Sequence, residues 1–232
     1  MGTAEQSPTY SYLNDDPQVS GTVQFTVGPV GSGIREINDA AFSFQRLMYI
    51  AWLNQYEDDY SPEEIARTVN PKDIALKDEQ ARRIAQSLES SGQPIYMQAV
   101  TKIPSLSERN HTLYDHTVGV GKSNFAGKKN EYADLSNVYV DPEYQARGIG
   151  SAILHHLLDG FPEDMRTVVY ELEANKHVER LFRSLGFRAV KRWKVLTFGE
   201  KLSQVYYSGP SVGDLTKEIE QKRPWLKNRE LI

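Results

Sequence analysis

The chain has 232 residues, of which 39% are hydrophobic and 25% are charged, a composition typical of a folded globular protein rather than a disordered one. Its 27 Lys and Arg residues and 31 Asp and Glu residues give a net charge of −4. That balance argues against a dedicated nucleic-acid binder and is compatible with a cationic substrate. The absence of cysteine excludes disulfides, thiolate zinc sites and a Cys-acyl intermediate.

No uncharged apolar stretch approaches the roughly 20 residues that a membrane helix needs. The first residues lack the basic start and apolar run of a signal peptide. We therefore expect a cytoplasmic protein with neither membrane nor nucleic acid as a partner, either a monomer or a homodimer. The five histidines show no metal-ligand spacing with acidic residues, so we expect no metal.

The N-terminal half combines strand and helix patterns. Residues 1–20 are polar and are expected to form a flexible arm, followed by a strand over 22–27 and a second short strand over 34–37. Asp39 is a candidate N-cap for a helix over 40–55, whose apolar stripe is Phe44, Leu47, Met48 and Ala51. Ser61 and Glu64 form a capping box, and a further helical stripe runs through residues 81–88.

The C-terminal half is richer in strands. We expect strands over 95–100, 113–120, 132–140, 166–172, 187–195 and 202–207, and helices over 148–159 and 178–185. The charged tail, 209–232, is expected to hold a short helix near Leu215 and Ile219 and otherwise to be a solvated face. Residues 21–208 therefore form one α/β domain between an arm and a tail.

One segment has a pattern that points to chemistry. The strand ending at Val140 leads through Asp141-Pro142 and a short loop to Gly148 and Gly150, which open an apolar helix. Closely spaced glycines let a ligand approach the backbone, and a helix start presents N–H groups without partners. We expect an anion site here, to which Arg147 adds positive charge.

This loop resembles that of the GNAT superfamily of N-acetyltransferases. Gln145-Ala146-Arg147-Gly148-Ile149-Gly150 is similar to the [Gln/Arg]-x-x-Gly-x-[Gly/Ala] pattern, and Asn175 to Phe187 is similar to the second motif, Asn-x-x-Ala-x-x-Leu-Tyr-x-x-x-Gly-Phe. The resemblance covers about residues 132–194. It implies an α/β (α+β) fold, a single domain with a central, mixed, mostly antiparallel twisted sheet of about seven strands flanked by helices.

The resemblance also implies acetyl-CoA as a co-substrate and an amine as the acceptor. In this family the loop amides hold the pyrophosphate, and the splayed strand and an Asn bind the pantetheine arm. The cofactor-binding positions that this implies are Val138, Val140, Gln145, Arg147, Gly148, Ile149, Gly150, Ser151, Asn175 and Phe182.

An amine attacks a thioester only when it is neutral, so a base must take a proton and a donor must polarise the carbonyl. By analogy with the family, the backbone N–H near Val138 is the carbonyl donor. Asp134 is the favoured base, because it matches the position of a catalytic Glu in histone-acetyltransferase-like members and lies four residues before Val138, which would place both on one strand face. An ordinary strand-edge role for Asp134 is equally open. Glu171 and Glu173 are the reserve bases.

The general acid departs from the family pattern. Phe182 occupies the position at which the family often has Tyr, and Phe donates no proton. Tyr139, Tyr170 or water could replace it. This departure favours one alternative to an enzyme, a sensor that binds acyl-CoA without turnover.

The acceptor is less defined. The acidic and aromatic segment Gln55-Tyr56-Glu57-Asp58-Asp59-Tyr60 could hold a cationic amine, although a solvated helix end explains it as well. We expect an N-acetyltransferase acting on a primary amine of a small molecule, with a protein lysine or N-terminus as an alternative. A nucleotide hydrolase is remote, because Gly121-Lys122-Ser123 lacks the first glycine of a P-loop, its place being taken by His116.

Overall fold

The computed structural model describes residues 9–12, 23–56, 60–69, 73–89, 95–104, 113–173, 175–197 and 200–227. The expected arm over 1–20 falls mostly outside these ranges, as do Glu57, Asp58 and Asp59. No helix in the described residues is long and apolar enough to cross a membrane.

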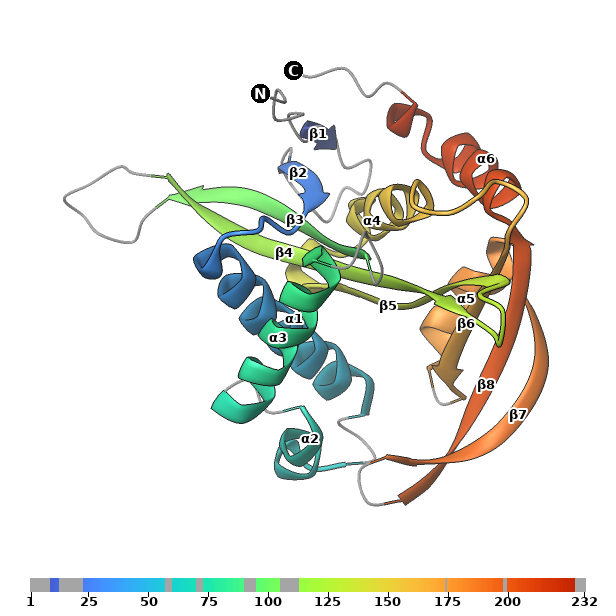
Figure 1. Ribbon diagram of the computed structural model, residues 1–232, viewed down its shortest axis with the longest axis horizontal. Coiled ribbons are helices and arrows are strands. Elements are labelled where there is room, and N and C mark those ends of the chain that lie inside the picture. The colour runs from blue at the N-terminus through green and yellow to red at the C-terminus, as the bar shows by residue number, and fades with distance from the viewer. Residues whose placement is uncertain are drawn as a thin grey trace.

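The domain is built on one sheet of eight strands in the order β1-β2-β3-β4-β5-β6-β8-β7 (Figure 1). The pairing is antiparallel between all neighbours except β5 and β6, which are parallel. The expected mixed, mostly antiparallel sheet is therefore confirmed, with one more strand than predicted. The strands are β1 (Thr9–Tyr12), β2 (Val23–Pro29), β3 (Ile95–Pro104), β4 (Leu113–Ala126), β5 (Tyr132–Val140), β6 (Arg166–Leu172), β7 (Arg188–Thr197) and β8 (Glu200–Ser211).

Helices cover both faces of the sheet. The helices are α1 (Ile34–Tyr56), α2 (Pro62–Thr68), α3 (Ile74–Glu89), α4 (Ile149–Leu158), α5 (Lys176–Ser184) and α6 (Val212–Lys222), with short 3₁₀ turns over Pro142–Tyr144 and Pro224–Leu226. In Figure 1, α1 to α3 lie on one face, and α4 and α6 lie on the other. The capping box of Ser61 and Glu64 is present, and α6 confirms the helix expected in the tail.

The buried residues form a separate apolar core on each face. The larger core joins α4, α5 and α6 to the sheet through residues such as Ile153, Phe182 and Leu215. The second core joins Phe44 and Leu47 of α1 to Tyr96 of β3. Because each face of the sheet carries its own helices, both faces of the central strands are apolar.

Two glycines of β4 bring α4 close to the sheet. A Cβ atom built on Gly121 would lie 2.2 Å from Cγ2 of Ile153, and one built on Gly119 would lie 2.8 Å from Cδ1 of the same side chain. Gly121, Lys122 and Ser123 are strand residues that pair with β3, so they form no phosphate loop. The glycines of this segment serve helix-to-sheet packing.

Several sequence expectations for individual elements were wrong. Residues 34–37 begin α1 instead of forming a strand, because Ile37, Ala40, Ala41 and Phe44 continue the helical stripe against the second core. Asp39 therefore lies inside α1 and is not its N-cap. Its Oδ2 lies 3.7 Å from Nε of Arg35. The strand expected over 113–120 extends to Ala126. Within the expected arm, β1 pairs with β2.

Candidate active site

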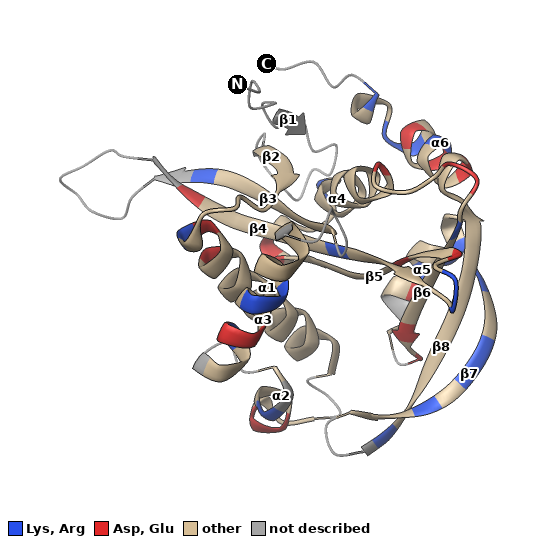
Figure 2. Cartoon of the chain, in the orientation of Figure 1, with Lys and Arg blue, Asp and Glu red and all other residues tan. Residues whose placement is uncertain are grey.

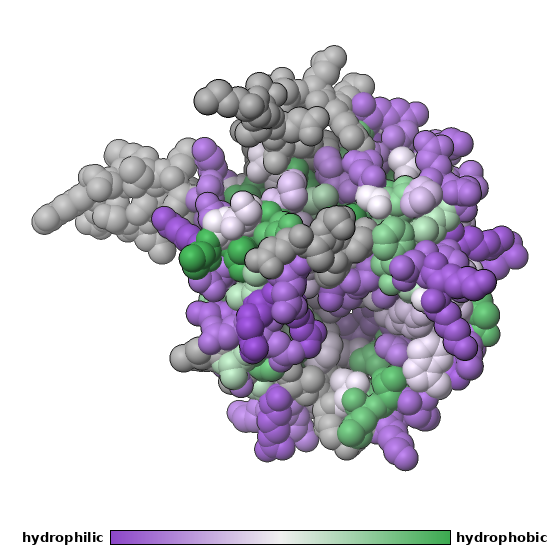
Figure 3. All heavy atoms as spheres, viewed as in Figure 1, coloured by the Kyte–Doolittle hydropathy of each residue, from purple (hydrophilic) through white to green (hydrophobic). Residues whose placement is uncertain are grey.

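A cavity of about 1170 Å³ opens where β5 and β6 separate. The two strands pair at Tyr132, Ala133 and Asp134 of β5, and no further pairing between them is present in the described residues. The cavity is lined from β5, β6, α1, α4, α5 and α6. It therefore passes through the sheet and connects the α4 side with the α1 side. The space-filling view in Figure 3, where most of the surface is hydrophilic, is hollowed between the α1 to α3 helices and the β7–β8 hairpin.

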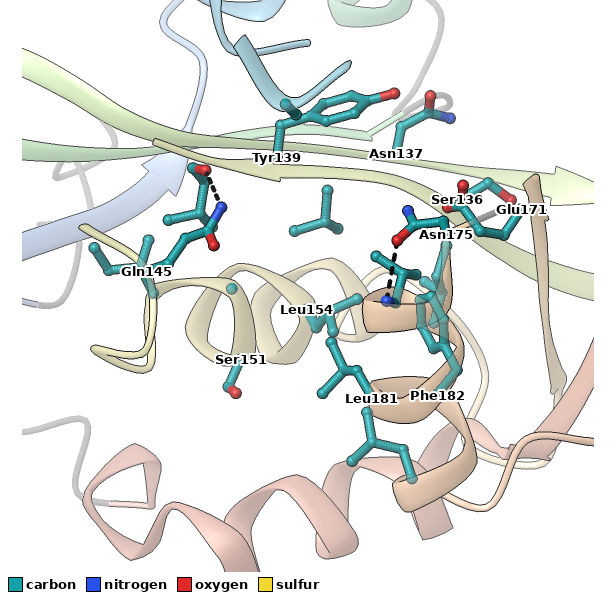
Figure 4. A pocket seen from close by; sticks show the side chains of 18 of the residues that line it. Ser136, Asn137, Tyr139, Gln145, Ser151, Leu154, Glu171, Asn175, Leu181 and Phe182 are labelled. Carbon is teal, nitrogen blue, oxygen red and sulfur yellow. Dashed lines mark hydrogen bonds between the residues drawn. The ribbon is translucent and has the colours of Figure 1, made fainter. Parts of the chain in front are cut away.

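The edge of β5 that faces the gap presents backbone groups that do not pair with β4. The N–H of Asp141 donates to the carbonyl oxygen of Val118 on β4 at 2.9 Å. Backbone polar groups alternate in direction along a strand, so those of Val138 and Val140 point away from β4 and toward the gap. The carbonyl of Val140 accepts a hydrogen bond from Nε2 of Gln145 at 3.1 Å, as Figure 4 shows. The backbone groups of Val138 thus face the gap, whereas the carbonyl of Val140 is engaged by Gln145.

The start of α4 forms one end of the cavity. Ala146 and Gly148 have φ angles of 59° and 78°, and this left-handed turn directs the chain into the helix. The first helical hydrogen bond runs from the N–H of Ala152 to the carbonyl of Gly148 at 2.9 Å, so the preceding amides lack helical partners. The residues of this turn that line the cavity are Ala146, Gly148, Ile149, Gly150 and Ser151.

Arg147 is placed differently from the expectation. Its guanidinium carbon lies 5.4 Å from the centroid of the Tyr144 ring, and the residue is not among those that line the cavity. Gln145, Asn175 and Phe182, in contrast, do line it. Nine of the ten expected cofactor-binding residues thus meet around one cavity, with Arg147 beside it.

The argument that Asp134 and Val138 share a strand face was wrong, because β5 contains a bulge. Asn124 of β4 pairs with Asp134 and Lys122 pairs with Asn137, so two residues of β5 oppose one of β4. The bulge reverses the alternation. Leu135 and Val138 both pack against the larger core, and Asp134 therefore points to the opposite face.

Asp134 serves the bulge through its hydrogen bonds. Its Oδ1 accepts from the N–H of Ser136 at 3.0 Å and from the hydroxyl of the same serine, whose Oγ accepts from the N–H of Tyr170 at 2.8 Å. Burial raises the pKa of the Asp134 carboxyl, and these bonds from Ser136 and the charge of Lys122 oppose that rise. The carboxylate lines the cavity, but it also holds the local backbone.

Glu171, one of the two reserve bases, lies in the gap itself. Burial raises the pKa of its carboxyl to about 7, although hydrogen bonds from Asn175 and from the N–H of Leu172 act in the other direction. Figure 4 shows Glu171 beside Asn175 and Ser136. A carboxyl with a pKa near neutrality is suited to take a proton from an ammonium group at physiological pH.

Asn175 connects this carboxyl to α5. Its Oδ1 accepts from the N–H of Val178 at 3.1 Å and caps the helix, while the side chain also hydrogen-bonds to Glu171. Glu173, two residues away, ion-pairs with Arg192 at 2.9 Å and does not line the cavity. The structure therefore places Glu171, and not Glu173, on the wall of the cavity.

The candidates for the general acid lie on the cavity wall. Phe182 is buried, and its ring centroid lies 5.0 Å from that of Phe187. Tyr139 and Tyr170 line the cavity, and burial raises the pKa of each phenol above its ordinary value. Tyr139 also hydrogen-bonds to Trp52, so its hydroxyl is held in place on the α1 side.

The far side of the cavity is formed by α1. The α1 residues that line it are Ala51, Trp52, Asn54, Gln55 and Tyr56. Sequence analysis identified Gln55 and Tyr56 but missed Trp52, Ser136, Lys222 and Arg223. The helical stripe of α1 predicted a buried face, yet nothing in its spacing distinguished core residues from cavity residues. Among the described residues, no cluster of His, Asp and Glu is suited to hold a metal ion.

Comparison with known proteins agrees with this architecture. A GNAT-family acetyltransferase from Streptococcus pneumoniae superposes with a TM-score of 0.51 at 14% identity, covering 81% of this chain and 99% of that one. A phosphinothricin acetyltransferase from Sinorhizobium meliloti, solved in complex with acetyl-CoA, superposes with a TM-score of 0.50 at 18% identity, covering 81% and 88%. The chain thus shares its fold with these two proteins.

The sequence comparison matches part of the chain to one family model. Residues 108–189 match the family model for the acetyltransferase (GNAT) domain, which includes β5, the loop, α4 and α5. This stretch of the chain is therefore similar to the GNAT acetyltransferase domain. It is also 42% identical over 57 residues to the [ribosomal protein bS18]-alanine N-acetyltransferase of Escherichia coli. That match covers 24% of this chain and 38% of the relative, so the chain spans well under half of the relative's length.

Proposed function

We propose that this protein is an N-acetyltransferase that transfers the acetyl group of acetyl-CoA directly to a primary amine. The observation that carries the proposal is the gap between β5 and β6, where the backbone edge of Val138 lines the same cavity as the Glu171 carboxyl, whose pKa is about 7. Val138 and Glu171 are thus our candidates for the carbonyl donor and the proton acceptor that the reaction requires.

The cavity offers a separate place for each part of acetyl-CoA. The amides at the start of α4 are suited to the pyrophosphate, since a helix N-terminus favours negative charge. The backbone edge of Val138 and Val140 is suited to the amide groups of the pantetheine arm, and the N–H of Val138 is our candidate donor to the thioester carbonyl. Asn175 stands where its amide would meet the same arm.

The chemistry follows from the positions around Glu171. The Glu171 carboxylate accepts a proton from the incoming ammonium group, directly or through water, and the neutral amine attacks the thioester carbon. The carbon–nitrogen bond forms, the nitrogen releases its second proton, the carbon–sulfur bond breaks, and the thiolate takes up a proton. Tyr139 and Tyr170 are our candidate donors of that proton, since Phe182 has none to give.

We propose a small-molecule amine as the acceptor. The α1 side of the cavity is lined by the aromatic rings of Trp52, Tyr56, Tyr139 and Tyr170, and aromatic faces attract cations. The carboxyl groups of Asp134 and Glu171 line the same cavity and add to that attraction. A polypeptide N-terminus is the second candidate, favoured by the 42% identity to a protein alanine N-acetyltransferase.

Release of CoA thiol from acetyl-CoA tests the proposal. A thiol-reactive dye reports CoA alone, because the protein contributes no thiol. The acceptor panel contains diamines, arylalkylamines, amino acids and a peptide that begins with alanine, and Glu171→Gln is the matched variant. Release that depends on a small amine and is lost in the variant supports the proposal.

The other outcomes separate the alternatives. Release with the peptide alone would assign a protein acceptor. Binding of CoA by calorimetry without release with any amine would indicate a sensor rather than an enzyme.

A further inference from the structure

The C-terminal helix α6 lines the same cavity, although it lies beyond the residues that match the family model. It packs across α4, where Nε2 of His155 lies 3.1 Å from Oε1 of Glu220, and its Leu215 and Ile219 belong to the larger core. Figure 4 shows Ser151 projecting from α4 toward the ribbon of α6. The end of α6 therefore stands opposite the helix start to which we assign the pyrophosphate.

The positive charge on the cavity wall comes from this helix. Lys222 and Arg223 are the cationic side chains among the described residues that line the cavity, since Arg147 is turned onto Tyr144. Figure 2 shows Lys and Arg at the C-terminal end of α6, where the chain turns into the last 3₁₀ segment. An anionic ligand at the start of α4 would find its side-chain counter-charges there.

Of the two cations, Arg223 is the better placed to receive a ligand. The ammonium of Lys222 lies 3.0 Å from Oε1 of Glu218 and donates to the carbonyl of Ser184, so it ties α6 to α5. Arg223 donates through NH1 to the carbonyl of Lys222 at 3.1 Å, and within the described part of the chain it pairs with no carboxylate. Its Nε is buried and has no hydrogen-bond partner there. A buried donor without an acceptor is costly, which indicates a group that the ligand supplies.

Packing around Gly148 brings this arginine to the phosphate end. Trp225 lies directly on Gly148, where an added Cβ atom would be 2.6 Å from Cζ2 of the indole ring. The same indole packs edge-on against Phe25 of β2, with ring centroids 6.2 Å apart. These contacts position residues 223–225 beside the first turn of α4.

We propose that Arg223 binds a phosphate group of the acyl-CoA, so that the C-terminal helix completes a site that the loop and α4 begin. The proposal rests on the proposed function, because it takes acyl-CoA as the ligand. A guanidinium forms paired hydrogen bonds with phosphate oxygens, which one ammonium cannot do. Lys222 has a supporting role, since it holds α6 against α5.

Calorimetric titration of the full chain with CoA and with 3′-dephospho-CoA tests this assignment. Arg223→Gln should weaken the binding of CoA by about tenfold or more, as expected for the loss of a charged hydrogen bond. Arg223→Lys should restore part of the affinity. Lys217→Gln is the matched control, because Lys217 is an exposed cation of the same helix outside the cavity, and it should change affinity less than about twofold.

Three further readouts distinguish ligand binding from a structural role. Arg223→Gln should raise the KM for acetyl-CoA while leaving kcat nearly unchanged, and it should reduce the dependence of affinity on salt. The melting temperature should stay within a few degrees of that of the parent chain. A weaker effect of the variant with dephospho-CoA than with CoA would place Arg223 at the 3′-phosphate, and equal effects would place it at the pyrophosphate.

The proposal is overturned if Arg223→Gln binds CoA with the affinity and salt dependence of the parent. It is also overturned if affinity falls only in proportion to a loss of folded protein. If the parent chain binds neither CoA nor dephospho-CoA, the proposed function itself fails, a result distinct from failure of the Arg223 assignment alone.

Discussion

Replacement of Glu171 by Gln should remove most of the activity and change its pH dependence. The carboxyl has a pKa of about 7, so about half of it is ionised at neutral pH. Gln keeps the shape of the side chain but accepts no proton. General base catalysis contributes typically 10² to 10⁴-fold, so we expect kcat to fall within about that range. In the parent chain, kcat/KM should decline about tenfold per pH unit below pH 7, and this decline should be absent in the variant.

The same substitution should stabilise the fold at high pH. The folded pKa of about 7 exceeds the ordinary value of 4.5, so the folded state binds the proton more tightly than the unfolded state. Stability from this group is therefore fully present below pH 4.5 and is lost as the pH rises through 7. Each pKa unit corresponds to about 1.36 kcal/mol, which gives a penalty of about 3 kcal/mol at pH 8. Glu171→Gln removes this penalty, apart from weaker hydrogen bonds to Asn175 and Leu172.

Urea denaturation at pH 8 and pH 4 measures this difference directly. We expect the variant to be more stable than the parent by about 2 kcal/mol at pH 8 and no more stable at pH 4. Glu173→Gln provides the rival test, since Glu173 pairs with Arg192 outside the cavity. The reasoning is refuted if Glu173→Gln, rather than Glu171→Gln, abolishes the pH dependence, or if Glu171→Gln lowers stability at pH 8.

The packing of the site leads to further expectations. Gly121→Ala should lower the unfolding free energy by about 1–3 kcal/mol in urea melts, because its Cβ atom would lie 2.2 Å from Cγ2 of Ile153. Gly150→Ala is the milder change, because its Cβ atom would lie 3.6 Å from Val140, and it should cost less than about 1 kcal/mol. Gly148→Ala combines a φ of 78° with contact against Trp225, so it should both destabilise the fold by more than about 1 kcal/mol and weaken CoA binding by calorimetry. Asn175→Ala should lower the unfolding free energy by about 1 kcal/mol, because the cap of α5 is lost. It should also move the midpoint of the pH–rate profile to higher pH, because a hydrogen bond that lowers the pKa of Glu171 is removed. An unmoved midpoint would argue against this link between Asn175 and Glu171.

Local patterns determined the elements around the loop. The alternation over 132–140, the two glycines and the apolar helix after them predicted β5, the turn and α4, and the capping box predicted the start of α2. These features depend on neighbours in the sequence, such as the φ of Gly148 or the hydrogen bond from Glu64 to Ser61. The resemblance of these motifs to the GNAT pattern therefore pointed to nine of the residues that line the cavity before the fold was known.

The choice of the candidate catalytic base depended on the tertiary structure. Strand periodicity indicated Asp134, but a bulge against β4 reversed the alternation, and a bulge depends on the partner strand as well as on the sequence of β5. Glu171 and Glu173 share one sequence neighbourhood. Glu171 lines the cavity because β6 separates from β5 there. Glu173 pairs with Arg192 because β7 lies beside it.

In the C-terminal tail, too, the sequence predicted the helix and the tertiary structure determined its position. Its charges were consistent with a solvated face, and the helix within it was readable from its apolar spacing. That the helix returns across α4 and places Arg223 at the cavity is a contact between segments about 75 residues apart in the chain. Backbone geometry and capping are local and can be predicted from sequence, whereas burial, pKa and the partners of a charged side chain are set by the segments that fold against it.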